Sequence, residues 1–186
     1  MIRGFIAIEI DSQTVKNISE RLAELKPRLP DIRWIPPDNF HLTLKFLGAV
    51  EETKTDPICA ALERELHPFP RFTINAKGLG VFPGVKRPRV LWVGLEGKEL
   101  TALASRVEAA LDPLGFTPEK REPKPHLTVA RWRQFEGSSR KLAADLESWK
   151  NHEFGETMVA EVVFFQSVLK PQGAVYHRLK TVALGK

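Results

Sequence analysis

Two histidines of this chain begin the same four-residue pattern, in which leucine, threonine and an aliphatic residue follow. The patterns are His41-Leu42-Thr43-Leu44 and His126-Leu127-Thr128-Val129. Each pattern follows a proline-containing turn and opens an apolar stretch, which predicts a strand. Because side chains two positions apart on a strand point to the same face, each histidine should share a face with its threonine.

Two imidazoles and two hydroxyls that face each other could catalyse an in-line displacement at phosphorus. A neutral histidine takes a proton from the attacking water, and a protonated one gives a proton to the leaving oxygen. The ordinary histidine pKa of about 6.5 allows both forms at neutral pH. Thr43 and Thr128 could donate hydrogen bonds to the non-bridging oxygens. We therefore predict His41 and His126 as a catalytic acid–base pair.

Two other interpretations of the histidines are weaker. Either one, alone in a strand, could simply bond to the backbone, but two of the five histidines carry the same pattern. A metal site needs more ligands than two histidines, and no cluster of His, Asp, Glu or Cys has ligand spacing in the sequence. We expect neither a metal nor a cofactor.

Alternating secondary-structure patterns must position the motifs. The expected strands cover residues 2–10, 33–35, 40–47, 72–80, 90–95, 126–132, 157–169 and 174–184. The expected helices cover residues 14–27, 54–67, 99–111 and 140–149, the first beginning at Asp11 or Ser12 and ending near Pro27 or Pro30. A charged, proline-rich loop is expected over residues 117–125.

The order of elements recurs with the offset of the two histidines, 85 positions (126 minus 41). This shift superposes strand 5–10 on 90–95, helix 14–27 on 99–112, helix 54–67 on 139–152 and strand 72–80 on 157–165. An internal duplication follows, so we expect an α+β fold in which residues 1–186 form one domain of two pseudo-symmetric lobes around a central cleft.

Composition favours an anionic partner and a reducing compartment. The formal net charge is +5 and the pI is about 9.4, and a basic protein attracts nucleic acids or phosphorylated metabolites. Cys59, the single cysteine, has no partner for an intramolecular disulfide and should be a core residue. No apolar run has the length of a membrane span. We expect a cytoplasmic monomer that does not bind membranes.

Longer segments around both motifs carry a family resemblance. Residues 34–48, WIPPDNFHLTLKFLG, and residues 125–131, PHLTVAR, are the two signature segments. The opening segment 3–8, the middle segment 82–92 and the closing segment 167–176 are also similar. Over nearly its whole length, the chain resembles the 2H phosphoesterase superfamily, and within it the RNA 2′,3′-cyclic phosphodiesterases, long called 2′–5′ RNA ligases.

The resemblance implies a bilobal fold, each lobe an antiparallel sheet with outer helices, and the two histidines in the central cleft. It implies hydrolysis of a terminal 2′,3′-cyclic phosphate to a 2′-phosphate on RNA, a tRNA-like molecule or an oligonucleotide. By analogy, His41 protonates the departing 3′ oxygen and His126 activates water. The sequence leaves these two roles interchangeable.

Three further residues are candidates for substrate or phosphate binding. Arg131 lies five positions past His126, so strict alternation puts it on the opposite face unless a bulge intervenes. Lys45 should share the face of Thr43. The hydroxyl of Tyr176 could line the cleft.

Aromatic and basic side chains could hold RNA. Phe40 and Trp34 could stack on a base, although the sequence favours core packing for each. Lys86, Arg87 and Arg89 could track phosphates in their loop. Two rival functions remain open: ligation or hydrolysis of another cyclic nucleotide by the same chemistry, and RNA binding without catalysis. The duplicated titratable pair argues against the second rival.

Overall fold

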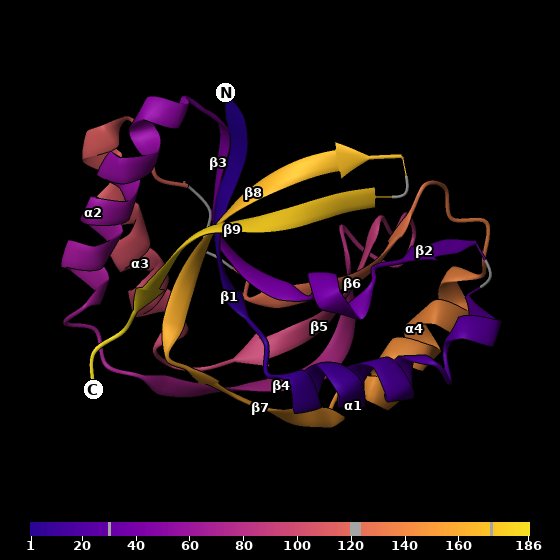
Figure 1. Cartoon of the computed structure of the whole chain (residues 1–186). Helices are drawn as coiled ribbons and strands as arrows, with labels where there is room; N and C mark the ends of the chain where they lie inside the picture. Colours follow the sequence, from indigo (N-terminus) through magenta and orange to yellow (C-terminus); the bar gives the residue numbers. More distant parts are fainter. Residues whose placement is uncertain (30, 120–123, 172) are drawn as a thin grey trace.

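The computed structural model describes residues 1–29, 31–119, 124–171 and 173–186. Over these residues the chain forms two antiparallel sheets and four α-helices (Figure 1). The strands are β1 (Ile2–Glu9), β2 (Ile32–Trp34), β3 (His41–Val50), β4 (Phe72–Phe82), β5 (Val90–Glu96), β6 (His126–Trp132), β7 (Glu153–Val159), β8 (Glu161–Lys170) and β9 (Gly173–Ala183). The helices are α1 (Ser12–Leu22), α2 (Thr55–Leu66), α3 (Leu100–Leu111) and α4 (Ser139–Trp149).

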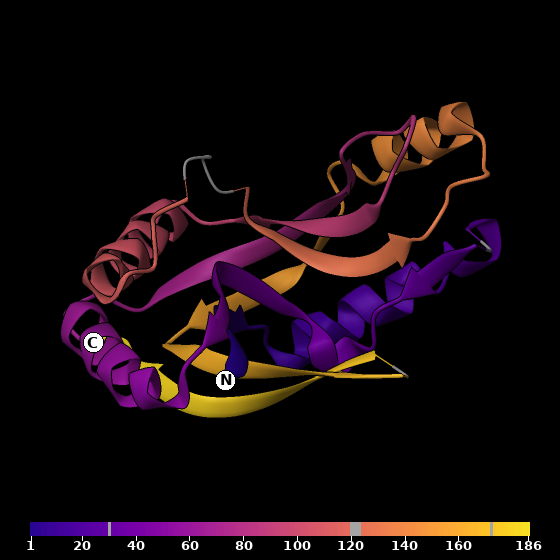
Figure 2. The same ribbon diagram turned by 90° about the horizontal axis from the view of Figure 1, so that it is seen from above.

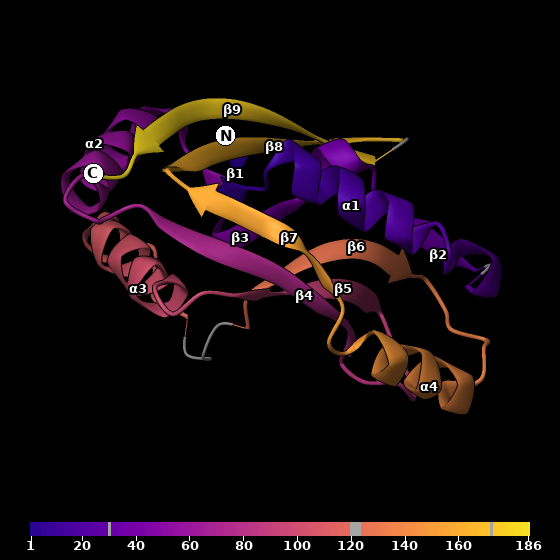
Figure 3. The same cartoon turned by 90° about the horizontal axis from the view of Figure 1, so that it is seen from below.

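The two motif strands belong to different sheets. The first sheet has the order β3-β1-β8-β9, and the second has the order β2-β6-β5-β4-β7. Figure 2 shows the sheets as two layers, with the helices at the ends of the layers. In Figure 3, α2 and α3 lie side by side at one end, and α1 and α4 lie toward the other. We call the first sheet the first lobe, and the second sheet with α3, the helix between β5 and β6, the second lobe.

Side chains along the central strands point alternately to the core and to the cleft. Ile6 and Ile8 of β1 and Leu91 and Val93 of β5 are at most 1% exposed, and they join the main hydrophobic core with residues of all four helices. Burial of such side chains is the main favourable term in folding. On the opposite face of β1, Phe5 belongs to a smaller apolar cluster that borders the cleft.

The predicted α+β class and bilobal architecture are confirmed, and most elements fall where the repeat offset of 85 places them. The first helix begins as expected, since the Asp11 carboxylate accepts hydrogen bonds from the backbone N–H groups of Gln13 and Thr14. It ends earlier, at Leu22, and a 3₁₀ turn over Lys26–Arg28 follows. Pro30 and residues 120–123 of the expected loop lie outside the described residues.

The single strand expected over residues 157–169 is wrong. Strand β7 ends at Val159 on the edge of the second sheet, and β8 begins at Glu161 in the first sheet. The Ala160 carbonyl between them accepts a hydrogen bond from the Leu184 N–H. The apolar pattern runs through the crossover because both strands contribute to buried surfaces, so sequence periodicity did not reveal the change of sheet. Within the described residues, no helix is both long and apolar enough to cross a membrane.

Candidate active site

A cavity of about 1100 Å³ lies between the two motif strands. It is lined by His41 and Thr43 of β3 and by His126 and Thr128 of β6. Each histidine thus shares the cavity with its threonine, as strand alternation predicts. The cavity joins side chains that are 85 positions apart in the sequence and lie in separate sheets.

Both imidazoles are held in the same way by the backbone. The Nδ1 atom of His41 lies 2.8 Å from the carbonyl oxygen of Asn39, and the Nδ1 atom of His126 lies 2.7 Å from that of Lys124. A carbonyl oxygen can only accept a hydrogen bond, so Nδ1 of each ring must carry a proton. The reactive nitrogen of both histidines is therefore Nε2, which is a base when the ring is neutral and an acid when it is protonated.

Aromatic rings pack around both histidines. The ring of Tyr176 meets His41 edge-on at 5.1 Å between centroids, and Phe5 packs on His41 at 4.9 Å. On the other side of the cavity, Phe82 meets His126 edge-on at 5.0 Å. These contacts restrict the orientation of both imidazoles and remove water from around them.

The electrostatic environment favours the neutral form of both rings. Burial is the largest cause that lowers the pKa of His41, and the charge of His126 lowers it further against the opposing effect of the Asn39 carbonyl. Burial also lowers the pKa of His126 most, and the cations of Arg131 and Lys124 add to this effect. A bound anion would favour the protonated form.

The two motif strands carry the same β-bulge. On β3, Thr43 pairs with Ala7 and Lys45 pairs with Ile6, so Leu44 is an extra residue. On β6, Thr128 pairs with Trp92 and Ala130 pairs with Leu91, so Val129 is an extra residue. All four pairs are related by the offset of 85. A bulge of this kind shifts the alternation of side chains by one residue.

Comparisons with known proteins agree with the duplicated site. A family model described as LigT like Phosphoesterase matches residues 8–92 and again residues 93–176. This chain belongs to the LigT-like phosphoesterase family. The two matched segments of this LigT-like phosphoesterase begin 85 positions apart (93 minus 8), which equals the offset between the two motif histidines.

Relatives and solved structures cover almost the whole LigT-like chain. A protein of Archaeoglobus fulgidus named RNA 2′,3′-cyclic phosphodiesterase is 35% identical, over 96% of this chain and 98% of the relative. One of Methanocaldococcus jannaschii with the same name is 33% identical, over 96% and 99%. A crystal structure from Thermus thermophilus has a TM-score of 0.84 at 27% identity, over 98% of both chains. The fold of Escherichia coli LigT, solved with 3′-AMP, is also similar, with a TM-score of 0.80 at 24% identity over 98% of both chains.

The bulge decides which predicted residues of this LigT-like phosphoesterase face the cavity. Arg131 lines the cavity, because the extra Val129 brings it back to the face of Thr128. The equivalent shift on β3 moves Lys45 off the face of Thr43, so its predicted placement is wrong. Although Lys45 borders the cavity, it is 2% exposed, and its ammonium contacts other protein groups.

The aromatic candidates divide between cavity and core. Tyr176 lines the cavity, as the sequence predicts, and burial raises the pKa of its phenol. Phe40 is 6% exposed and belongs to the main core, so its placement on a substrate surface is wrong. Trp34 also packs against that core. Lys86 and Arg87 are exposed in their loop and do not line the cavity.

Several cavity residues escaped the sequence analysis. Arg3 and Lys124 line the cavity and bring positive charge to its two sides. The side chain of Asn39 donates a 3.0 Å hydrogen bond to the Ala174 carbonyl, which ties β9 to the turn before His41. A signal existed for Arg3 and Asn39, since both lie in segments that carry the family resemblance, but nothing in their local pattern indicated a direct role.

Proposed function

We propose that this LigT-like phosphoesterase hydrolyses the 2′,3′-cyclic phosphate at an RNA end to a 2′-phosphomonoester, with His41 and His126 as the acid–base pair. The observation that carries the proposal is the duplicated Nδ1–carbonyl hydrogen bond, which makes Nε2 the reactive atom of each ring. The names of the relatives support the same substrate class.

The reaction needs two proton transfers and one displacement. One neutral Nε2 removes a proton from water as the water oxygen attacks phosphorus in line with the P–O3′ bond. That bond breaks, and the protonated Nε2 of the other histidine gives its proton to O3′. The product keeps phosphate on O2′, and the histidines end in exchanged protonation states, which solvent resets. Thr43, Thr128 and Arg131 are suited to hold the non-bridging oxygens.

The charges around the rings favour one assignment of roles. Burial lowers the pKa of both histidines, but only His126 is also depressed by Arg131 and Lys124. Those cations favour a neutral His126, which suits the base. His41 then becomes the acid, protonated when the anionic phosphate enters the cavity. This agrees with the roles implied by the family resemblance.

The charge of the chain fits a nucleic-acid substrate such as RNA. The formal net charge is +5, and the cations of Arg3, Lys124 and Arg131 lie along the cavity. Such cations attract a phosphate backbone. We also propose that the chain is a single-domain monomer of the cytoplasm. A core shared by both sheets and all four helices supports the single domain.

Product analysis tests the proposal. The protein is incubated, in chelator, with an RNA that ends in a 2′,3′-cyclic phosphate. We expect a 2′-phosphate from the wild type and from His67→Ala, an exposed histidine outside the cavity that serves as the control. We expect turnover lower by about 10²–10⁴-fold in His41→Ala and in His126→Ala.

Other outcomes would favour a rival function. Tight RNA binding by all four proteins without turnover would indicate a binding module and contradict the proposal. A 3′-phosphate product would show that the P–O2′ bond breaks instead of the P–O3′ bond. Ligation of a 2′,3′-cyclic end would be the same displacement with a 5′-hydroxyl in place of water as the nucleophile, and we expect it to be slower than hydrolysis in water.

A further inference from the structure

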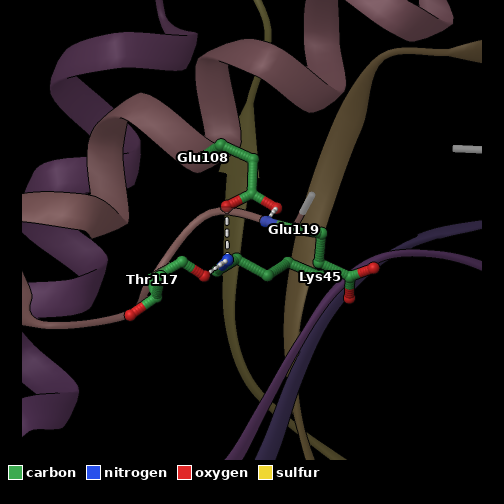
Figure 4. Close-up of polar contacts among 4 residues, drawn as sticks. All are labelled: Lys45, Glu108, Thr117 and Glu119. Atoms are coloured by element: carbon green, nitrogen blue, oxygen red, sulfur yellow. Dashed lines mark hydrogen bonds and ion pairs between the residues drawn. The ribbon is translucent and has the colours of Figure 1, made fainter. Parts of the chain in front are cut away.

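Lys45 forms a nearly inaccessible ion pair at the edge of the cavity. Its side chain is 2% exposed, and its ammonium contacts the carboxylate of Glu108, a side chain that is 20% exposed. The same ammonium donates a 3.0 Å hydrogen bond to the Thr117 carbonyl. The other carboxylate oxygen of Glu108 accepts a 3.4 Å hydrogen bond from the Glu119 backbone N–H. Figure 4 shows these four residues around the ammonium.

This network joins the two lobes that carry the histidines. Lys45 lies on β3, four positions after His41, in the first lobe. Glu108 lies on α3, the helix that precedes the strand of His126 in the second lobe. Lys45, Glu108 and Glu119 all border the cavity. The ion pair therefore spans the wall of the cleft at its α3 end.

The internal duplication does not repeat this ion pair, because the second motif strand has no equivalent lysine. The position equivalent to Lys45 in the second motif strand is Ala130, a fully buried alanine. A lysine at a buried position costs desolvation free energy that an alanine avoids. The cost is offset because two directional contacts, to the Glu108 carboxylate and to the Thr117 carbonyl, fix the ammonium. Such contacts define a relative position better than apolar packing does.

We infer that Lys45 and Glu108 form a strut between the lobes that sets the separation of His41 and His126, so both are positioning residues for the proposed reaction. The expected effect on turnover rests on the proposed function, whereas the expected effect on the positions of the two histidine rings does not. A positioning role for Lys45 differs from direct phosphate binding, because its ammonium is already bound by a carboxylate and a carbonyl. A displacement of about 1 Å between reacting groups can reduce a rate by about 10²-fold.

The test compares Lys45→Met with the double variant Lys45→Met/Glu108→Met. The single variant leaves the Glu108 carboxylate without its cation and should be less stable to heat. The double variant removes both charges, which restores stability in many buried pairs, and it remains the folded test if the single variant does not fold. Arg28→Met is the matched control, because Arg28 pairs with Asp145 of α4, a side chain that is 12% exposed, and neither residue borders the cavity.

Two measurements decide the inference. The first is an NMR titration of the histidine rings in substrate-free protein, in which we expect the pKa of His41 to move toward its ordinary value in both Lys45 variants but not in Arg28→Met. The second is steady-state kinetics on RNA with a 2′,3′-cyclic phosphate, in which we expect kcat to fall about 10–100-fold and KM to change by less than about threefold.

Three results would overturn the strut. Histidine titrations that match the wild type in both Lys45 variants would show that the pair does not position the rings. Normal kcat with a lower melting temperature would reduce the pair to a structural role. A raised KM at normal kcat would make Lys45 a substrate ligand instead. If the wild type does not turn over the cyclic phosphate, the proposed function fails, and the titration alone still decides the strut.

Discussion

Phe46 and Arg131 occupy equivalent positions in the two lobes, each five residues after its motif histidine and each turned to the cavity by the same bulge. Phe46 is 64% exposed, so it presents an open aromatic face where the other lobe presents a cation. The duplicated strands therefore make two histidine–threonine pairs but one guanidinium. The symmetry of the backbone does not extend to the charge of the cleft.

The guanidinium that the second motif strand carries, and the first does not, predicts a one-sided effect of mutation. Arg131→Ala should lower kcat/KM for a cyclic phosphate by about 10–100-fold, because a hydrogen bond to a charged group contributes about 1.5–3 kcal/mol. Arg131→Lys should recover only part of the loss, since an ammonium cannot make the paired contacts of a guanidinium. Steady-state kinetics of both variants would check this, and full activity in Arg131→Ala would exclude phosphate contact.

The depressed pKa values predict an acidic optimum for kcat/KM. Burial lowers the pKa of both histidines below 6.5, so the singly protonated pair of the free enzyme exists mainly below pH 6.5. We expect kcat/KM to decline as pH rises above that value. In the complex the phosphate raises the pKa of the acid, so the decline of kcat should begin at higher pH. If the pH profiles of kcat/KM and kcat coincide and have their maxima well above pH 6.5, the lowered pKa values of the two histidines are contradicted.

The same directions predict how stability depends on pH. A histidine whose pKa is lower in the folded state binds fewer protons there than in the unfolded chain. Its contribution to the free energy of unfolding is therefore complete above pH 6.5 and is lost as pH falls toward the folded pKa. Urea unfolding between pH 7.5 and 4.5 (about three units around the ordinary histidine value) should show this decrease. It should be smaller in His41→Phe than in the wild type, and an equal decrease in both would rule out His41 as a source.

Proton transfer by two imidazoles predicts activity without a bound metal. After dialysis against a chelator, hydrolysis of the cyclic phosphate should retain its full rate, because in the proposed mechanism side chains perform both proton transfers and stabilise the charge on phosphate. The metal content of the dialysed sample would be measured in parallel. A loss of rate that is restored by adding one divalent cation would refute the metal-independent mechanism.

The residues of the proposed catalytic pair could be recognised from local sequence alone. His41-Leu42-Thr43 and His126-Leu127-Thr128 repeat a short pattern, and strand alternation follows from the geometry of three consecutive residues. The repeat offset likewise located four of the paired elements, because helical and strand periodicities are properties of contiguous segments. These features depend on neighbours in the chain, so they can be derived without knowledge of the fold.

Only the tertiary structure decided where Arg131, Lys45 and the strand after α4 belong. The extra residues Leu44 and Val129 exist only relative to the partner strand, so alternation misplaced Lys45 and left Arg131 undecided. The change of sheet at Ala160 and the Lys45–Glu108 ion pair depend on contacts between distant segments. Strand pairing and burial are set by such long-range contacts, and local periodicity contains no information about them.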